Sequence, residues 1–480
     1  MTPRANFRRP GVAFIAIASA AILFWFGNGL NPLWPLLWFA PLPVLLFAAG
    51  ASWWSAALTA WLAIFIGSFN LWSYLRLLGV PPGSCVVMFS ILALVFALAV
   101  LLFRVLLRRG AAWSALLAFP STWVCFEYLR NFVTPHGTAG SLAYSQLNFL
   151  PFLQLASITG PWGMTFLLLT FPAVIAIGLE LRRLQPKRAL RIVSTGLGVI
   201  ALVLIFGAVR LALPQGGDRV TVGLAASDAP GNAGMPRGAN AARLFSAYAA
   251  AAQELAARGA QVIVLPEKLA VMGDSDRGIA DDDFQSLANR TKSTIVAGVE
   301  YVSPPLKYNQ ARVYVPGAPL RTYDKQHMLP PFESDLKPGT SLTILPQSPS
   351  PRGVEICKDM DFTPLSRAYG QAGVGLMLAP AWDFNLDRWW HGHIAVMRAV
   401  EDGYSLVRAA KNGYLTVTDD RGRILAERRS DSAPFATLLA RVPTAHNSTI
   451  YLKLGDWFPW FAIIALVFAL IQLCVRARSS

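Results

Sequence analysis

Charged residues are scarce in this sequence. They make up 14% of the 480 residues, whereas hydrophobic residues make up 54%. Soluble domains usually carry about a quarter charged residues, so the deficit argues against a wholly soluble protein. Acidic residues are the scarcer sign, with 27 Asp and Glu against 42 Lys and Arg, which gives a formal net charge of +15. Such an excess would suit nucleic acid only if the basic residues were clustered on a folded domain.

The basic excess lies elsewhere. Residues 215–456 hold 26 basic and 25 acidic residues and are nearly neutral. In the apolar remainder, one set of alternating loops has only Arg76, Arg130 and Arg210. The other set holds Arg4, Arg8, Arg9, Arg104, Arg108, Arg109, Arg182, Arg183, Lys187, Arg188, Arg191, Arg476 and Arg478. This alternation follows the positive-inside rule, so we expect both termini in the cytoplasm and the neutral stretch on the periplasmic side. It excludes nucleic acid as the partner.

Long apolar runs account for the rest of the composition. A run of about 17–25 apolar residues can cross a bilayer as a helix, and we count about eight. They cover residues 11–27, 33–49, 54–75, 85–107, 112–130, 161–181, 192–213 and 457–475. Three of them contain prolines: the second, the fifth and the sixth. The sequence thus predicts a transmembrane helical domain at 1–213, a periplasmic domain at 214–456, and a final helix with a cytoplasmic tail at 457–480.

Cysteine is also rare. Cys85, Cys125 and Cys474 fall inside predicted spans, where a thiol is usually a small apolar residue. Cys357 is the one cysteine between residues 214 and 456, so a disulfide within that domain is excluded. An unpaired thiol in an oxidising compartment is open to damage unless it has a use, and this favours a chemical role for Cys357.

The domain at 214–456 alternates strand and helix patterns. "DRVTVGLAAS", "AQVIVLPE", "STIVAGVEYV" and "VGLMLAPAW" are apolar runs of strand length, and "NAARLFSAYAAAAQELAARG" and "WWHGHIAVMRAVEDG" have helical patterns. The acidic stretch "GDSDRGIADDD" is predicted as a loop before a helix near 283–292. Strands that alternate with helices indicate α/β layers in which the strands are covered on both faces.

Three polar residues directly follow apolar strands: Glu267, Lys325 and Cys357. Strand ends in layered α/β folds are where sites collect. A thiol becomes a nucleophile when a base removes its proton, and an ammonium group can stabilise a developing oxyanion. From the residues alone, Glu267 and Lys325 could equally be loop charges and Cys357 a buried structural thiol.

Around these residues, "VLPE", "YDKQHMLPPFE" and "ICKDMDF" resemble the three catalytic boxes of the nitrilase, or carbon–nitrogen hydrolase, superfamily. "PSTWVCFEYLR", "LQLASITGPWG" and "TIYLKLGDWFPW" extend the likeness into the predicted spans, so most of the chain resembles the apolipoprotein N-acyltransferase family, the membrane branch of that superfamily. The resemblance implies an αββα sandwich with Glu267 as base, Lys325 as the catalytic lysine and Cys357 as nucleophile.

The resemblance also implies roles around this triad. Glu333 in "PFESD" matches a further family carboxylate, although it could be an ordinary loop charge. The backbone N–H of Lys358 would donate to the oxyanion, and Asp359 would stand beside it. Trp382 matches an aromatic residue that contacts substrate in the family or packs in the core.

Several positions depart from the family pattern. The family usually has Tyr-Glu after the cysteine, where this chain has Lys358-Asp359. The lysine could lower the pKa of the thiol or change which head group is accepted. "LAPAWDF" is less polar than the family's run, and the loop "TPHGTAGSLAYSQ" lacks a Phe-Pro-Trp-like element. These departures leave the chemistry in place and put the identity of the substrate in doubt.

The family resemblance implies a reaction at the bilayer. Cys357 would take an acyl chain from a membrane phospholipid as a thioester and pass it to the N-terminal amine of a diacylglyceryl-cysteine apolipoprotein. We expect the protein in the bacterial inner membrane, as a monomer with no organic cofactor. Apolar residues of two loops, Met272, Leu329 and Phe332, could dip into the bilayer surface or simply face solvent.

Three other functions are considered. An amidase tethered to the membrane, or an acyltransferase with a different amine acceptor, would use the same triad. A transporter or a lipid-binding protein with an inactive domain is a different class, and the intramembrane Glu127 could favour transport, although Arg130 one turn away could simply pair with it. A metal enzyme is not expected, because no carboxylate or cysteine completes a ligand set around His391 and His393 in "HGH".

Overall fold

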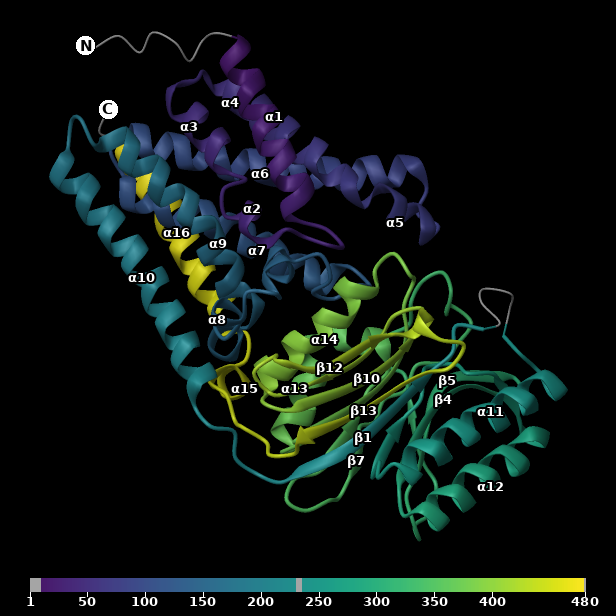
Figure 1. Ribbon diagram of the computed structural model, residues 1–480. Coiled ribbons are helices and arrows are strands. Elements are labelled where there is room, and N and C mark those ends of the chain that lie inside the picture. Colours follow the sequence, from purple (N-terminus) through teal and green to yellow (C-terminus); the bar gives the residue numbers. More distant parts are fainter. Residues whose placement is uncertain (1–9, 230–234, 479–480) are drawn as a thin grey trace. The chain divides into compact units, whose positions relative to one another are not determined.

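The computed structural model describes residues 10–229 and 235–478 and divides into two compact units. The first unit takes in Met1–Thr134, Gly140–Leu211 and Leu454–Ser480, and the second takes in Pro135–Ala139 and Ala212–Lys453. Figure 1 shows the first as a set of long helices and the second as packed strands flanked by helices.

The first unit is built from helices. Its long members are α1 (Pro10–Gly27), α4 (Trp53–Gly67), α6 (Pro82–Arg108), α7 (Ala112–Val133), α9 (Ala156–Leu181), α10 (Pro186–Ala212) and α16 (Trp457–Arg478). Among the described residues, six stretches are long and apolar enough to cross a membrane: 10–27, 53–77, 82–108, 156–181, 186–212 and 457–475. Together these correspond to six of the eight predicted spans.

The other two predicted spans differ from those six. The run at 33–49 is broken into α2 (Trp34–Leu37) and α3 (Leu42–Gly50), with a turn around Pro41. Proline has no backbone N–H and disrupts a helix interior, which explains the break. The run at 112–130 does form one helix, α7, with Pro120 inside it, but α7 is not among the six apolar stretches.

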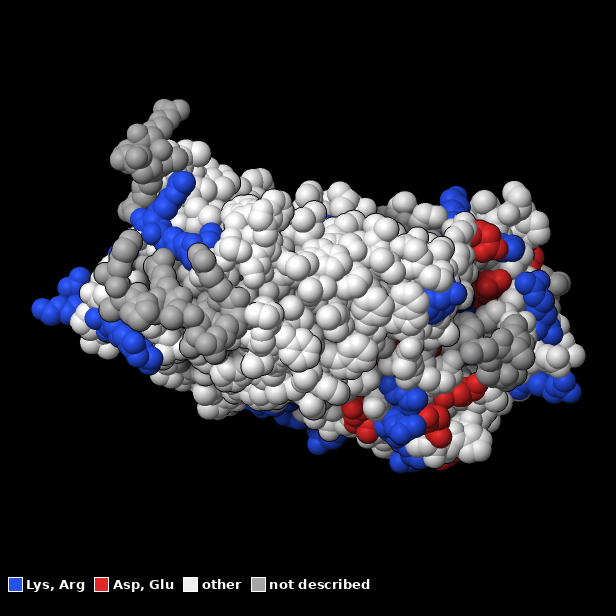
Figure 2. All heavy atoms as spheres, turned by 90° about the horizontal axis from the view of Figure 1, so that it is seen from above, with Lys and Arg blue, Asp and Glu red and all other residues white. Residues whose placement is uncertain are grey.

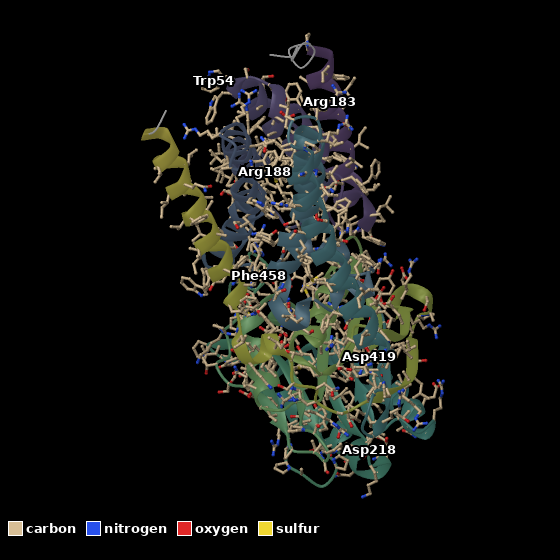
Figure 3. The ribbon with its side chains drawn as sticks, turned by 90° about the vertical axis from the view of Figure 1, so that its left-hand side faces the viewer. Trp54, Arg183, Arg188, Asp218, Asp419 and Phe458 are labelled. Carbon is tan, nitrogen blue, oxygen red and sulfur yellow. The ribbon has the colours of Figure 1, made fainter. Side chains whose placement is uncertain are left out.

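Basic residues of separate loops lie at one end of the helical unit. Arg109 donates a hydrogen bond to the Leu473 carbonyl oxygen, and Arg188 donates one to the Gly110 carbonyl oxygen. Figure 3 shows Arg183 and Arg188 toward one end of the helices and Phe458 toward the other. Figure 2 views the molecule from above, and residues other than Lys, Arg, Asp and Glu, drawn in white, form most of the surface seen there. Arg4, Arg8 and Arg9 lie outside the described residues.

Glu127 has a structural role inside the helical unit. Its carboxylate accepts hydrogen bonds from Trp123 Nε1, Ser141 Oγ, Thr165 Oγ1 and the Leu142 backbone N–H, at 2.8–3.0 Å. A buried carboxylate with donors on several sides is held in place. Glu127 therefore ties α7 to α9 and to the turn that begins at Leu142, a structural role that accounts for the buried carboxylate without transport.

Two sheets form the centre of the second unit. One sheet has the order β13-β1-β2-β4-β5-β6, with β3 also paired to β4, and the other has the order β12-β11-β10-β9-β8-β7. The strands are β1 (Arg219–Ala226), β2 (Val262–Val264), β3 (Val271–Gly273), β4 (Thr294–Ser303), β5 (Leu306–Tyr314), β6 (Arg321–Asp324), β7 (Thr343–Leu345), β8 (Arg352–Val354), β9 (Leu376–Trp382), β10 (Ser405–Lys411), β11 (Tyr414–Thr418), β12 (Ile424–Arg429) and β13 (Ala436–Pro443).

Helices cover the outer face of each sheet. α11 (Gly238–Ala257) and α12 (Asp274–Thr291) pack on the first sheet, and α13 (Thr363–Gln371) and α14 (Arg388–Asp402) pack on the second. A third apolar core fills the space between the sheets, with Val222, Val264 and Leu378 fully buried in it. The layers are therefore helix, sheet, sheet, helix, and the predicted αββα sandwich is confirmed.

Some local predictions were wrong. Helix α12 begins at Asp274, so the acidic stretch is not a loop. Met272 lies in β3 and is fully buried, so it cannot reach a bilayer surface. Its side chain packs with the core under α11 and α12 instead. Strand β13, which pairs antiparallel with β1 along eight residues, was not predicted at all.

Candidate active site

The three residues of the predicted triad lie just beyond strand ends of the two facing sheets. Glu267 comes after β2, Lys325 directly after β6, and Cys357 at the start of a 3-10 helix, η3 (Cys357–Asp361), that follows β8. All three side chains are buried. Cys357 has a positive φ of 46°, a strained conformation for a residue with a Cβ. The sharp turn carries the thiol out of the strand direction.

Glu267, Lys325 and Glu333 form one hydrogen-bonded network. Lys325 Nζ lies 2.9 Å from Glu267 Oε1 and 2.8 Å from Glu333 Oε2. Asn309 Nδ2 donates to both carboxylates, at 2.5 Å to Glu267 Oε1 and 2.7 Å to Glu333 Oε1. Lys268 Nζ donates to Glu333 Oε1 at 2.8 Å. The structure thus brings the predicted Glu333 against Lys325.

One oxygen of this network stands apart. Glu267 Oε2 is buried and has no hydrogen-bond partner among the described residues. A carboxylate oxygen in that position keeps its lone pairs available, whereas Oε1 of the same residue is held by Lys325 and Asn309. Glu267 is therefore fixed by one oxygen and free to accept a proton at the other.

The charges of the network stabilise one another. Burial by itself would lower the pKa of Lys325, but the carboxylates of Glu267 and Glu333 raise it well above its usual value. Burial would raise the pKa of Glu333, but Lys325 and Lys268 bring it far below the ordinary range. Lys325 therefore stays an ammonium ion and Glu333 a carboxylate at any physiological pH.

The Cys357 thiol is protonated at rest. Burial and the neighbouring Glu267 raise its pKa well above the usual value, while Lys325 and Arg408 act in the opposite direction. Sγ lies 3.5 Å from the Trp382 carbonyl oxygen, to which the thiol donates. Because only the thiolate is a strong nucleophile, this site needs a base to take the proton as the thiol reacts.

Asp359 joins the cysteine turn to the loop that follows Lys325. Its carboxylate accepts hydrogen bonds from the Tyr323 hydroxyl at 2.7 Å and from the backbone N–H groups of Gln326 and His327 at 3.1 and 2.8 Å. Its side chain is fully buried. Asp359 therefore positions Cys357 relative to the strand that carries Lys325.

The Lys358 side chain contacts residues around the cysteine turn. Its Nζ lies 3.3 Å from His136 Nδ1, 3.8 Å from Asp361 Oδ2 and 5.3 Å from the centroid of the Phe362 ring. Lys325 and Arg408 are the cations that lower the pKa of Cys357 most, and Lys358 also interacts with the thiol, so its effect on the thiol pKa stays a prediction. The Lys358 backbone N–H, at the first turn of η3, remains a predicted oxyanion donor.

Trp382 lies between two lysines. Lys411 Nζ is 3.4 Å from the centroid of its ring, and Lys268 Nζ is 5.5 Å from it. Burial lowers the pKa of Lys411 to about 7, although Glu267 raises it. Trp382 and Lys411 also line a small cavity together with Ser227, Met235, Leu244, Tyr248 and Leu269. The ring thus lines a cavity that has both polar and apolar residues in its wall.

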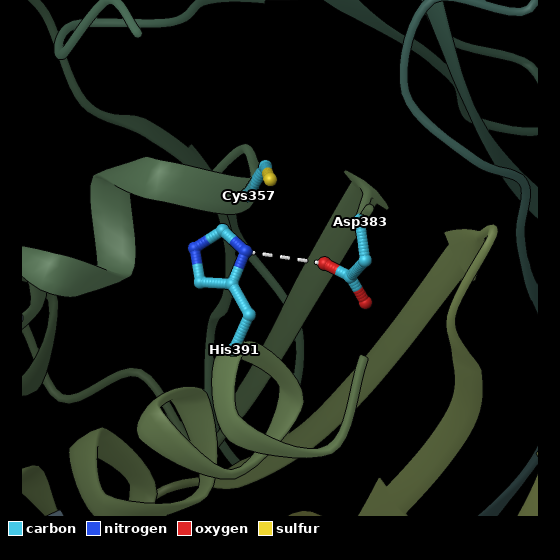
Figure 4. Close-up of side chains that lie close together, drawn as sticks. All are labelled: Cys357, Asp383 and His391. Atoms are coloured by element: carbon cyan, nitrogen blue, oxygen red, sulfur yellow. Dashed lines mark ion pairs between the residues drawn. The ribbon is translucent and has the colours of Figure 1, made fainter. Parts of the chain in front are cut away.

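A second group of charged residues was missed by the sequence analysis. Figure 4 shows His391 of α14 beside Cys357 and Asp383. One donor atom from each of the three lies within 4.8 Å of the others, so a carboxylate and a cysteine do stand around His391. Asp383 directly follows β9, and the rule that picked out Glu267 after β2 could have found it.

The trio has the donor types of a metal site, but its arrangement does not fit one. Arg408 occupies both carboxylate oxygens of Asp383, at 2.9 and 2.5 Å. The two nitrogens of His391 face Asp383 at 3.2 Å and Asp361 at 3.6 Å. A metal ligand must offer a lone pair, and a His391 ring whose pKa is raised to about 10 is protonated on both nitrogens at neutral pH.

Both parts of the chain match known protein families. Residues 7–174 match the apolipoprotein N-acyltransferase N-terminal domain, and residues 230–443 match the carbon–nitrogen hydrolase domain. The amidase of Nesterenkonia sp. has a similar solved structure, with 17% identity over 52% of this chain and 97% of its own and a TM-score of 0.42.

Full-length relatives carry both parts. The apolipoprotein N-acyltransferase of Geobacter metallireducens is 28% identical over 93% of this chain and 92% of its own length. Those of Shewanella oneidensis and Vibrio cholerae are 26% and 27% identical over 91% and 88% of this chain and 87% and 89% of their own. Together with the six apolar helices, these matches make the chain a multi-pass bacterial membrane protein. It belongs to the apolipoprotein N-acyltransferase family.

Proposed function

We propose that this protein moves an acyl chain from a membrane phospholipid to the N-terminal amine of a diacylglyceryl-cysteine apolipoprotein. One observation carries the proposal: within the described residues, a buried, protonated thiol stands beside an ammonium ion and a carboxylate with one unpartnered oxygen, in a chain that also has six apolar helices there. The names of its full-length relatives support the substrate classes.

In the first half-reaction, Glu267 Oε2 takes the proton of Cys357 as Sγ attacks the ester carbonyl carbon. Lys325 Nζ and backbone N–H groups of η3 hold the oxyanion that forms. When the tetrahedral intermediate collapses, the C–O bond breaks. The departing lysophospholipid oxygen takes the proton back from Glu267, which leaves an acyl thioester on Cys357.

In the second half-reaction, the apolipoprotein amine attacks the thioester carbonyl carbon. Glu267 accepts a proton from the amine, a C–N bond forms, and the C–S bond breaks. The proton then passes from Glu267 to the Cys357 sulfur, so the enzyme returns to its starting state. Each half-reaction uses the same base and the same oxyanion donors, which is why one free carboxylate oxygen suffices.

The surroundings of the site suit a lipid donor. Phe332, one residue before Glu333, is 49% exposed, and its ring centroid lies 5.4 Å from that of Phe384. Leu386 is 44% exposed in the same loop as Phe384. Exposed apolar side chains at this density mark contact surfaces for apolar partners. They could hold the acyl chains that a phospholipid presents to Cys357.

We also propose that the catalytic unit lies on the periplasmic side of the inner membrane and that the protein acts as a monomer. The gathering of Arg109 and Arg188 at one end of the helices supports this orientation, since basic loops stay in the cytoplasm. Protease added outside spheroplasts should cleave the unit at 212–453. Cleavage only in inverted vesicles would reverse the orientation.

Intact mass spectrometry tests the chemistry. The purified full-length protein, incubated with phospholipid vesicles, should gain the mass of one acyl chain and lose it again in hydroxylamine, as a thioester does. Cys357→Ala should gain nothing, whereas Cys474→Ala, which changes an exposed cysteine, should behave as the wild type.

The same samples separate the competing enzyme classes. A diacylglyceryl-cysteine peptide added to the acylated protein should remove the adduct and appear as an N-acylated product. If no lipid forms an adduct but a simple amide is hydrolysed, the protein is an amidase with the same triad and the proposal is wrong.

A further inference from the structure

The acyl-transfer steps leave one set of charged residues beside the thiol unused. His391 Nδ1 lies 3.2 Å from Asp383 Oδ1, and His391 Nε2 lies 3.6 Å from Asp361 Oδ1. Asp361 ends the 3-10 helix that begins at Cys357, whereas Asp383 follows β9. The imidazole ring therefore bridges the turn that holds the nucleophile and the strand next to it (Figure 4).

Asp383 is held firmly from its other side. Arg408 Nη1 and Nη2 donate to its two oxygens at 2.9 and 2.5 Å, and both side chains are buried. A two-point contact of this kind fixes the plane of the carboxylate. Asp383 is thus a rigid partner for His391, and it cannot turn to take the proton of the thiol.

We propose that His391 is a positioning residue for the nucleophile. As an imidazolium ion it fixes the cysteine turn through Asp361 and Asp383, and its charge beside Sγ stabilises the thiolate. The inference rests on the proposed role of Cys357, but it concerns ionisation of the thiol, a property that can be measured without lipid.

The sign of the effect follows from the charges. Burial alone would lower the pKa of His391, but Asp361 and Asp383 raise it to about 10, so the ring is charged at neutral pH. Loss of that charge leaves Arg408 to balance both Asp383 and Asp361, and the resulting excess of one negative charge near Sγ opposes ionisation. The charged groups that act on Cys357 or His391 include Glu267, Lys325, Lys358, Asp361, Asp383 and Arg408.

His393 offers a matched control on the same helix. Its Nδ1 donates to the Trp389 carbonyl oxygen at 2.7 Å, and its ring stacks on that of Trp389 with centroids 4.4 Å apart. Burial lowers the pKa of His393 to about 4, so it is neutral at physiological pH. The two histidines of "HGH" therefore differ in charge and surroundings although both are largely buried.

Alkylation kinetics test the proposal. In full-length protein with Cys85, Cys125 and Cys474 changed to alanine, iodoacetamide reports on Cys357 alone. In His391→Gln, the rate profile against pH should move up by about one pH unit, so that alkylation is about tenfold slower at a given pH. In His393→Gln, rates should stay within about twofold of the parent.

A second variant separates charge from loosening of the fold. Asp361→Asn removes a carboxylate from the same cluster, so the profile should move to lower pH, opposite to His391→Gln. An unmoved profile in His391→Gln, or one in Asp361→Asn that does not move to lower pH, would overturn the inference. Neither result affects whether an acyl adduct forms on Cys357, so failure here is distinct from failure of the proposed function.

Discussion

Two flanks of the thiol carry the same kinds of charge but hold one carboxylate each, Glu267 and Asp383, in different ways. The base flank consists of Glu267, Lys325, Glu333 and Lys268, and the support flank consists of Asp383, Arg408, His391 and Asp361. Each pairs two carboxylates with two cations. In the base flank, Glu267 Oε2 has no partner among the described residues, whereas in the support flank Arg408 holds both oxygens of Asp383.

This comparison shows how two carboxylates near one thiol acquire different roles. A base needs a lone pair that no cation has claimed, and Glu267 alone of the two offers one. Asp383 accepts hydrogen bonds at both oxygens from the Arg408 guanidinium, so it is suited to a structural role rather than to proton transfer. Loss of Glu267 should therefore act mainly on the rate of acyl transfer, and loss of Asp383 should act mainly on stability.

The largest effect is expected in the base flank. Glu267→Gln keeps the size of the side chain and removes the proton acceptor from both half-reactions, so acyl-enzyme formation should fall by about 10²–10⁴-fold. Thermal stability should change little. Mass spectrometry of the adduct against time measures the rate, with Glu254→Gln on the exposed face of α11 as control. A near-normal rate in Glu267→Gln would place the base elsewhere.

In the support flank, we expect a substitution to lower stability rather than the rate of acyl transfer. Asp383→Asn leaves the buried guanidinium of Arg408 without its counter-charge, and breaking a buried pair in this way costs about 3–5 kcal/mol. The apparent melting temperature in detergent should fall clearly, while the folded fraction retains a base and a nucleophile. Asp431→Asn, which breaks surface pairs with Arg429 and Arg388, is the matched control and should have almost no effect. Equal falls in melting temperature in Asp383→Asn and Asp431→Asn would refute the structural role of the support flank.

The two flanks also differ in how far the sequence alone could predict their residues. Glu267, Lys325 and Cys357 each follow an apolar run, so strand patterns alone pointed to them. His391 lies in the first turns of an amphipathic helix, where a histidine is ordinarily a surface or core residue. Its role depends on the packing of α14 against η3 and β9, and no local sequence pattern predicts that these elements come into contact.

Local chemistry also limited the prediction of the fold. Apolar length identified six spans, but the run at 33–49 is as apolar as the others and is interrupted at its prolines. Met272 is in a strand of three residues, too short to show alternation. Strand β13, the antiparallel partner of β1, was missed because its residues show no regular alternation of buried and exposed positions.

A smaller effect is expected in the pH dependence of stability. The pKa of His391 is raised to about 10, above its ordinary value, so its stabilising contribution is complete below about pH 6.5 and is lost as pH rises toward 10. The wild type should therefore lose more stability than His391→Gln between these limits, and their melting temperatures should converge by about 2–4 °C. Lys411, with its pKa lowered to about 7, contributes in the opposite direction in both proteins and cancels from the difference. Parallel curves would show that His391 is neutral.

The smallest effect is expected between the two flanks, at Lys358. Its ammonium lies 3.8 Å from Asp361 and 3.3 Å from His136, and burial lowers its pKa. Lys358→Met keeps the length of the side chain and should change the rate of Cys357 alkylation by less than about threefold, because Lys325 and Arg408 carry more weight at Sγ. Lys325→Met provides the contrast, since it leaves Glu267 and Glu333 without their shared cation. A tenfold change in the rate of Cys357 alkylation in Lys358→Met would mean that Lys358 acts on the thiol together with the residues of the base flank.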